Sequence, residues 1–308
     1  MLVFFSIKYK IRFMDSIDIK TLKVNEFHKG YLKRIANIKF PIFSIIEFNL
    51  HGSCNRRCAF CPRVDEKLWP NKDEEFSLEL FSRIVNQLKD VDYSGRISFS
   101  GFSEPTLHSK LTEILLLIKE NLPKAYPEII TNGDYLNKKK LHEFFEAGLK
   151  FIYVSLYNNK QTYDKLIQLK KDLNLTDAQY SVRPRNLGSK KNFGLNLNNR
   201  AGAVDYNTFG KEIKQDFPLK QSCNYPMYTI FVDYNGDTLI CPNDWDKRKI
   251  IGNVNNENIL NIWNNEQFNN VRKRLLNKNR DEIPCEKCNV NGLIVGKEFS
   301  HLWEKIYK

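Results

Sequence analysis

The sequence has no apolar run long enough to cross a membrane, and its N-terminus lacks the features of a signal peptide. A short apolar run, Leu2–Phe5, is followed rather than preceded by basic residues, and it is shorter than the apolar region of a signal peptide. We expect residues 1–13 to form a strand or an ordered arm. The protein is therefore expected to be soluble and cytoplasmic, without a membrane partner.

Cysteine is scarce and odd in number, since the 308 residues contain seven. An odd count without a secretory segment disfavours a disulfide framework and favours a reducing compartment. The cysteines fall into two widely separated sets. These are Cys54, Cys58 and Cys61 in the first set, and Cys223, Cys241, Cys285 and Cys288 in the second.

Acidic residues are outnumbered, because 36 Asp and Glu face 48 Lys and Arg, and the net charge is +12. This excess invites a nucleic-acid interpretation. The densest basic segments, 138–140, 189–191 and 272–274, contain no aromatic residue on which a base could stack. A solvated basic face is therefore favoured over an RNA groove. An anionic small substrate, such as a phosphorylated or nucleotide-linked sugar, fits the charge equally well.

Short apolar runs alternate with amphipathic stretches from residue 42 onward, which is typical of repeated βα units around a parallel sheet. With 42% hydrophobic residues the chain can bury a substantial core, and no internal repeat or low-complexity linker interrupts it. The predicted strands are 42–50, 96–100, 128–131, 151–156 and 180–185. The predicted helices are 78–88, capped by Ser77, then 111–122, 141–149 and 163–173.

The first cysteine set follows the strand 42–50 directly, in a loop of small and polar residues. A [4Fe–4S] cluster normally takes four cysteine ligands, so three thiolates would leave one iron open for chemistry. The three cysteines together with His51 could instead bind zinc, for which thiolate and imidazole are ordinary ligands. The residues alone thus indicate a metal site and leave the metal open.

The spacing Cys-x3-Cys-x2-Cys, with Phe60 before the last cysteine, resembles the signature of the radical S-adenosylmethionine (radical SAM) enzymes. The resemblance implies an α/β fold, a partial (β/α)6 barrel, in which the open iron binds the amino and carboxylate groups of SAM. It also implies that one electron, from a donor such as flavodoxin or ferredoxin, splits SAM to a 5′-deoxyadenosyl radical that abstracts hydrogen. SAM, an electron donor and a small-molecule substrate are the expected partners.

The resemblance also assigns SAM contacts to loops at the carboxyl ends of the strands, where βα arrays place their active sites. Residues 102–105 lie where the family usually has Gly-Gly-Glu-Pro, and this chain departs from that pattern at its first two positions. Taken alone, several of these residues fit a turn or a cap equally well. Arg183 is preferred to Arg185 as the clamp of the SAM carboxylate. The implied contacts are Phe60, Gly101, Phe102, Ser103, Glu104, Asn132, Ser155 and Arg183.

The second cysteine set can close a metal site completely. An Asn-Gly turn predicts a hairpin of strands 228–232 and 238–240 that brings Cys223 and Cys241 together, and a helix over 259–268 follows. Four thiolates with a Cys-x2-Cys half suit structural zinc as well as an iron–sulfur cluster.

Downstream of a radical SAM loop, this second set resembles the SPASM/twitch extension of that superfamily. It is similar to the shorter form, which holds one auxiliary [4Fe–4S] cluster and occurs in aminocyclitol dehydrogenases. The resemblance implies two [4Fe–4S] clusters in all. It divides the chain into an N-terminal extension 1–41, a radical SAM core 42–210 and an auxiliary-cluster domain 211–308.

If both sets hold clusters, no free cysteine remains to return a hydrogen atom to a substrate radical. This favours oxidation of an alcohol to a ketone, with the auxiliary cluster accepting an electron, over epimerisation, for which a tyrosine could still be the donor. The short flanks, 1–41 and 289–308, leave little room for a leader-peptide domain and favour a sugar or cyclitol substrate. A peptide maturase and a zinc-binding non-enzymatic module remain alternatives. Candidate substrate contacts, which could instead hold loops together, are Arg200, Asp244 and Asp246.

Overall fold

The computed structural model describes residues 24–27, 29–31, 42–185, 198–205, 216–296 and 300–307. The expected N-terminal strand or arm, residues 1–13, lies outside them. Helices alternate with strands from β1 to α6, which confirms the α/β class expected from the sequence. Among the described residues, no helix is long and apolar enough to span a bilayer.

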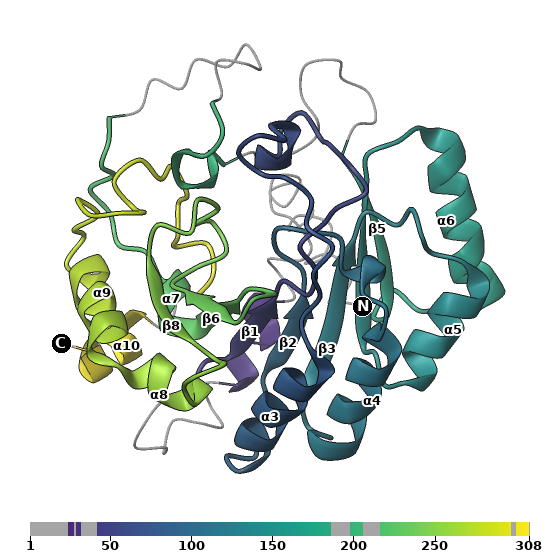
Figure 1. The fold of residues 1–308 in the computed structure, drawn as a ribbon, viewed down its shortest axis with the longest axis horizontal. Coiled ribbons are helices and arrows are strands. Elements are labelled where there is room, and N and C mark those ends of the chain that lie inside the picture. Colours follow the sequence, from purple (N-terminus) through teal and green to yellow (C-terminus); the bar gives the residue numbers. More distant parts are fainter. Residues whose placement is uncertain are drawn as a thin grey trace, which may run out of the picture.

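One eight-stranded sheet organises the described chain, in the order β5-β4-β3-β2-β1-β6-β7-β8 (Figure 1). The first six of these strands pair in parallel, whereas β7 pairs antiparallel with both β6 and β8. The five strands predicted before residue 186 are confirmed. The strand bounds are β1 (Ile45–Phe48), β2 (Arg96–Phe99), β3 (Tyr126–Thr131), β4 (Phe151–Leu156), β5 (Tyr180–Pro184), β6 (Thr229–Val232), β7 (Asp237–Leu239) and β8 (Ile250–Asn253).

The C-terminal hairpin is part of this same sheet. β6 and β7 confirm the hairpin predicted around Gly236, whose φ of +88° is a conformation that glycine adopts without steric cost. β6 also pairs in parallel with β1, from Ile45 opposite Thr229 to Phe48 opposite Val232. Because β1 leads into the first cysteine loop, the shared sheet fixes the two cysteine-bearing segments relative to each other.

Four helices cover one face of the parallel strands: α3 (Leu78–Lys89), α4 (Leu111–Asn121), α5 (Lys138–Glu146) and α6 (Lys160–Asp172) (Figure 1). Ser77 caps α3 as predicted, since its hydroxyl oxygen accepts from Leu80 N at 3.0 Å. Asn137 and Asn159 cap α5 and α6 in the same way. These helices therefore begin one turn before the apolar periodicity predicted, because their caps precede it.

The C-terminal helices are α7 (Tyr225–Tyr228), α8 (Ile259–Asn264), α9 (Glu266–Leu276) and α10 (Ser300–Tyr307). The single helix predicted over 259–268 is wrong, because the chain breaks into two helices at Asn265. This residue has an extended backbone, and its side-chain oxygen accepts from Phe268 N at 2.8 Å, which starts α9. The helix α10 was not expected from the sequence.

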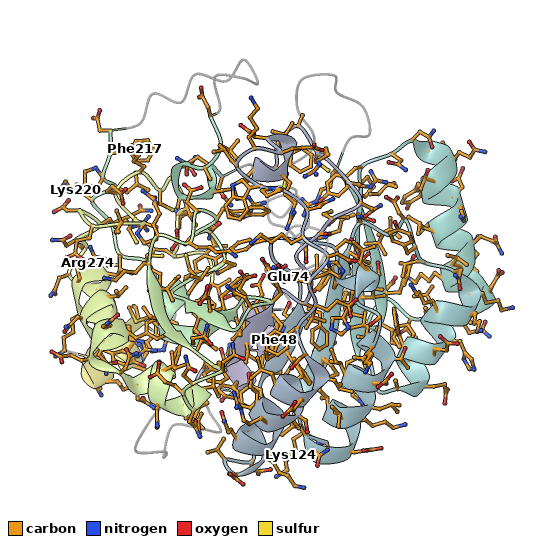
Figure 2. The ribbon with its side chains drawn as sticks, in the orientation of Figure 1. Phe48, Glu74, Lys124, Phe217, Lys220 and Arg274 are labelled. Carbon is orange, nitrogen blue, oxygen red and sulfur yellow. The ribbon has the colours of Figure 1, made fainter. Side chains whose placement is uncertain are left out.

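The two faces of the strands differ in chemistry, as the alternation of strand side chains allows. Phe48 and Phe99 belong to the buried apolar core beneath the helices, and Phe48 lies near the middle of the view in Figure 2. The alternating residues Glu47, Ser98 and Glu128 point to the other face, where they line a cavity. The apolar face therefore packs against the helices, and the polar face is available for a site.

A short N-terminal helical segment, residues 24–27 and 29–31, packs at the amino ends of the strands. The buried Tyr31 donates its hydroxyl hydrogen to Phe43 O at 3.2 Å, just before β1. The Phe27 ring lies 6.0 Å from the ring of Tyr126, where β3 begins. This segment thus closes the end of the sheet opposite to the cysteine loop.

Candidate functional site

The first cysteine loop is anchored by side chains that the sequence analysis did not single out. Cys54 N donates to Asn71 Oδ1 at 3.1 Å, and Asn71 Nδ2 donates back to Cys54 O at 3.2 Å. The buried Arg63 donates to Gly52 O at 2.9 Å and also to Phe102 O. The loop is therefore tied both to the segment that follows it and to the loop after β2.

The three thiols of this loop gather where they influence one another. Burial raises the pKa of Cys54, Cys58 and Cys61, and the neighbouring thiols raise it further for Cys54 and Cys58, to about 12 for Cys58. The metal-free loop is therefore protonated at neutral pH, and metal binding there must release protons.

His51 is occupied by other partners. Its Nδ1 accepts from Ser53 N at 2.9 Å, and its Nε2 lies 3.7 Å from a Glu75 carboxylate oxygen. Burial lowers the pKa of His51, so the ring is neutral at neutral pH. These contacts give His51 a role in shaping the loop and do not favour the zinc alternative, in which it would bind metal beside the thiols.

Asn49, the residue after β1, connects the loop that follows β2 with the C-terminal hairpin. Its Oδ1 accepts from Phe102 N at 3.1 Å and from the Ser103 hydroxyl at 2.6 Å. Its Nδ2 donates to Asp233 Oδ1 at 2.6 Å. Gly101 in this loop has a φ of +108°, which explains why a glycine stands there. Asn49 lies inside the predicted strand 42–50, so the sequence pattern did not identify it as a site residue.

The Glu104 carboxylate accepts hydrogen bonds from other residues of the protein. It accepts them from Asn132 N at 2.8 Å, from the Thr131 hydroxyl at 2.6 Å, and from Thr106 N at 3.1 Å. The side chain is buried, and burial raises its pKa. The Glu104 carboxylate, an expected SAM contact, thus already accepts from at least three donors within the protein.

The other expected SAM residues lie around the cysteine loop at the carboxyl ends of β3 to β5. Asn132 Nδ2 donates to Asn55 Oδ1 at 2.7 Å, which links the end of β3 to the cysteine loop. The Phe60 ring lies 5.2 Å from the ring of Tyr157. At the neighbouring strand ends, Arg183 Nη2 donates to Ser155 Oγ at 3.1 Å.

The second cysteine set is also gathered into one place. Cys241 is influenced by all three other thiols, which add to the effect of burial in raising its pKa. Burial likewise raises the pKa of Cys285 to about 12 and that of Cys288 to about 11. The Cys-x2-Cys half forms a turn in which Cys288 N donates to Cys285 O at 3.1 Å.

The donor sets fit iron–sulfur clusters, which are held by cysteine thiolates. In the part of the chain that the structure describes, no three His, Cys, Asp or Glu side chains are arranged as ligands of one metal ion. The sulfurs of each set nevertheless act on one another electrostatically. Three thiols suit a cluster with one open iron, and four thiols suit a closed one.

A cavity of about 210 Å³ opens on the polar face of the sheet. Gly101 lines it from the loop after β2, and Tyr225 and Pro242 line it beside Cys223 and Cys241. The cavity therefore extends from the loop tied to the first thiol set to the residues that adjoin the second set. Its polar lining includes Glu47, Ser98, Glu128, Asn198, Arg200 and Asn243.

The three expected substrate residues lie in different surroundings. Arg200 lines the cavity. Asp244 is buried in the loop after Cys241, where its carboxylate accepts from Arg248 N at 3.1 Å and Lys249 N at 2.9 Å, and burial raises its pKa. Asp246 is exposed. Arg200 alone of the three is thus brought to the cavity wall.

Comparisons with known proteins agree with this geometry. The Radical SAM superfamily matches residues 48–174, and an iron-sulfur cluster-binding domain of the SPASM type matches residues 223–289. The S-adenosyl-L-methionine-dependent 2-deoxy-scyllo-inosamine dehydrogenase of Niallia circulans is 31% identical over 254 residues, which are 80% of this chain and 93% of the relative.

Solved structures give the same result. The crystal structure of BtrN in complex with AdoMet and 2-DOIA superposes with a TM-score of 0.68 at 27% identity, over 84% of this chain and 98% of that chain. BtrN in an open conformation gives a TM-score of 0.59 at 26% identity, over 81% and 94% of the two chains. Because the two family models cover both thiol sets and a 31% identical relative matches 80% of the chain, the chain belongs to the radical SAM superfamily and carries a SPASM-type iron–sulfur cluster-binding domain.

Proposed function

We propose that this protein oxidises one alcohol of a small, cyclitol-like substrate to a ketone. Bound at the first thiol set, a [4Fe–4S] cluster with SAM supplies the 5′-deoxyadenosyl radical that removes a hydrogen atom from the carbinol carbon. The second electron leaves to a cluster at the second thiol set, and the hydroxyl proton leaves to a base. The observation that carries the proposal is the cavity, which borders the loops of both sets.

Tyr225 connects the cavity with the second thiol set. It lines the cavity two residues after Cys223. Burial raises the pKa of Tyr225, and nearby Cys223, Glu47 and Cys241 raise it further. A substrate against Tyr225 would thus lie next to the sulfurs that hold the proposed electron acceptor, as oxidation requires. The same phenol is the donor that epimerisation would use, and the assay in deuterated water distinguishes the two reactions.

The size and chemistry of the cavity favour a single polar ring as substrate. About 210 Å³ is smaller than the pockets that hold drug-sized ligands, so a peptide segment fits it poorly. Glu47, Ser98 and Asn243 offer hydrogen-bond partners for hydroxyl or amino groups, and Arg200 offers a guanidinium. The similar dehydrogenase of Niallia circulans is named for an aminocyclitol substrate, and we extend that substrate class to this chain.

SAM contacts are proposed for the residues around the first cysteine loop. The backbone of Gly101 and Ser103 would receive the SAM amino group, because Phe102 O is already used by Arg63. Asn132, Ser155, Arg183 and Phe60 remain proposed contacts for the ribose, carboxylate and adenine. A small electron-transfer protein, flavodoxin or ferredoxin, is the proposed donor.

Anaerobic reconstitution followed by assay tests the proposal. We expect about eight iron atoms per chain from two four-iron clusters, SAM cleavage on reduction, and a ketone product from 2-deoxy-scyllo-inosamine or a related aminocyclitol. The assay is run in deuterated water. A product that keeps the alcohol and carries deuterium at that carbon would indicate epimerisation instead. Stoichiometric zinc without 5′-deoxyadenosine would overturn the proposal entirely.

A further inference from the structure

Arg280 is a buried cation that joins two of the segments bearing the second thiol set, the one with Cys223 and the one with Cys285 and Cys288. Only 1% of its surface is exposed. Its guanidinium donates to four backbone oxygens on either side of the set: Gln221 O at 3.0 Å, Ser222 O at 2.8 Å, Val290 O at 2.7 Å and Asn291 O at 2.9 Å. Every one of these acceptors is electrically neutral.

The guanidinium also lies close to the sulfurs. A Cβ atom placed on Gly292 would come within 2.5 Å of Cys223 Sγ and within 2.9 Å of Arg280 Nη2, so these two groups border the same small space. The charge of Arg280 opposes the burial that raises the pKa of Cys223, Cys285 and Cys288. One fixed positive charge thus acts on three of the four thiols.

No carboxylate neutralises this charge among the residues that the structure describes. Of the two acids that directly follow Arg280, Asp281 pairs with Lys220 at 3.3 Å and Glu282 pairs with Arg274 at 3.0 Å. A buried cation without a counter-ion is costly, because hydrogen bonds to carbonyl groups satisfy its donors without cancelling its charge. An anionic group at the four thiols would cancel it.

We propose that Arg280 raises the reduction potential of the iron–sulfur group held by the second thiol set, by stabilising its reduced, more negative state. Uptake of one electron adds one negative charge, and a fixed cation in a buried surrounding favours that charge. The electron comes from the substrate radical, which becomes a ketone as its hydroxyl proton departs. The inference therefore rests on the proposed function, and Arg280 acts in it through its fixed charge.

The test measures a potential in the full chain. Cys54, Cys58 and Cys61 are replaced by alanine, so that the C-terminal group is the one that remains to be titrated anaerobically by optical and electron paramagnetic resonance spectroscopy. We expect Arg280→Gln to lower the equilibrium constant for reduction at least tenfold, which is about 59 mV for a one-electron couple. Arg280→Lys keeps the charge without the planar fork and should stay near the parent potential.

Arg274 provides the matched control. It acts on Cys285 more strongly than Arg280 does, but it acts on that thiol and not on Cys223 or Cys288, and it is paired with Glu282 at 3.0 Å. Arg274→Gln should therefore shift the potential much less than Arg280→Gln. Arg274 lies on α9 and is labelled at the left of the view in Figure 2. Equal shifts for the two variants, or no shift for Arg280→Gln, would overturn the inference.

A second variant tests the effect of Arg280 on the reduction potential if Arg280→Gln does not retain iron. Asn291→Asp keeps the side-chain acceptor that Leu293 N uses at 3.0 Å and the backbone oxygen that Arg280 uses. Its new negative charge should offset Arg280 and lower the potential in the same direction by a smaller amount. An unchanged or raised potential would contradict the inference.

The inference and the proposed function can fail separately. A parent protein without an iron–sulfur signal at the second thiol set would refute the proposed function. A parent protein with that signal, whose potential does not respond to Arg280 or Asn291 variants, would refute the inference alone. If the potential responds to these variants as expected but the product is still an alcohol, the inference about Arg280 stands and the proposed dehydrogenase activity is refuted.

Discussion

Asn49 Nδ2 lies 2.6 Å from Asp233 Oδ1, and this hydrogen bond joins the end of β1 to the end of β6. Both side chains are buried, and Lys247 pairs with the same carboxylate. Since Asn49 also accepts from Phe102 N and the Ser103 hydroxyl, one amide couples the loop after β2 to the C-terminal hairpin. The two thiol sets are thus connected by side chains as well as by the sheet.

Replacing Asn49 by aspartate should break this connection. Asn49→Asp sets two carboxylates against each other, and we expect a loss of about 1–3 kcal/mol in the free energy of unfolding. The double variant Asn49→Asp with Asp233→Asn restores a donor and an acceptor and should recover part of that loss. Anaerobic urea denaturation of the four proteins gives the coupling. Strictly additive effects would show that the pair is not coupled.

Glu104→Gln should have a larger effect on the stability of the protein than on its affinity for SAM. The amide nitrogen of glutamine would face at least one of the donors that now bond to the carboxylate, such as Asn132 N or the Thr131 hydroxyl. We expect the unfolding free energy to fall by about 1–3 kcal/mol. The SAM dissociation constant should change by less than about tenfold, or ~1.4 kcal/mol. A large loss of SAM affinity at unchanged stability would instead assign the carboxylate to SAM.

Arg200→Gln should lower kcat/KM, because it removes contacts with the substrate. Arg200 lines the cavity, and loss of hydrogen bonds from a charged donor costs about 1.5–3 kcal/mol, so kcat/KM should fall roughly tenfold to a hundredfold. The exposed Asp246 provides the control, and Asp246→Asn should leave kcat/KM unchanged. SAM cleavage without substrate should be the same in both variants. Equal kcat/KM in Arg200→Gln and the wild type would remove Arg200 from the substrate site.

His51 should make stability depend on pH. Burial lowers the pKa of His51 below its ordinary value of 6.5, so the folded protein binds a proton there less readily than the unfolded chain. Its neutral form contributes stability that is present above pH 6.5 and is lost as the pH falls toward the lower folded pKa. His51→Gln should give a flatter profile of urea midpoint against pH below 6.5. Parallel profiles for the two proteins would exclude this role.

Local sequence patterns predicted the parts of the fold that depend on local physics. The alternation of apolar runs and amphipathic stretches located β1 to β5, and an Asn-Gly turn located the β6–β7 hairpin. Ser77 was predicted as a cap because a short polar side chain preceded a helical apolar pattern. The cysteine spacing identified the first thiol set and the Cys285 and Cys288 half of the second for the same reason, since ligands close in sequence share one loop.

Long-range pairings could not be predicted in this way. The register of β6 against β1 joins residues that are 184 positions apart, as in the pair Ile45 and Thr229. Asn49, Arg63 and Arg280 have partners set by tertiary packing, so isolated polar residues gave no signal for them. Asp244 illustrates the reverse case, because an acid expected near the substrate is used by two backbone N–H groups.

The ratio of ketone to 5′-deoxyadenosine tests the central claim most directly, in the wild type and in a Cys285→Ala, Cys288→Ala variant. Both proteins retain the first thiol set, so both should cleave SAM in the presence of an aminocyclitol. We predict about one ketone per 5′-deoxyadenosine in the wild type and a loss of ketone, with continued 5′-deoxyadenosine formation, in the variant. Ketone formed by the variant at the wild-type ratio would contradict the assignment of the second set as electron acceptor.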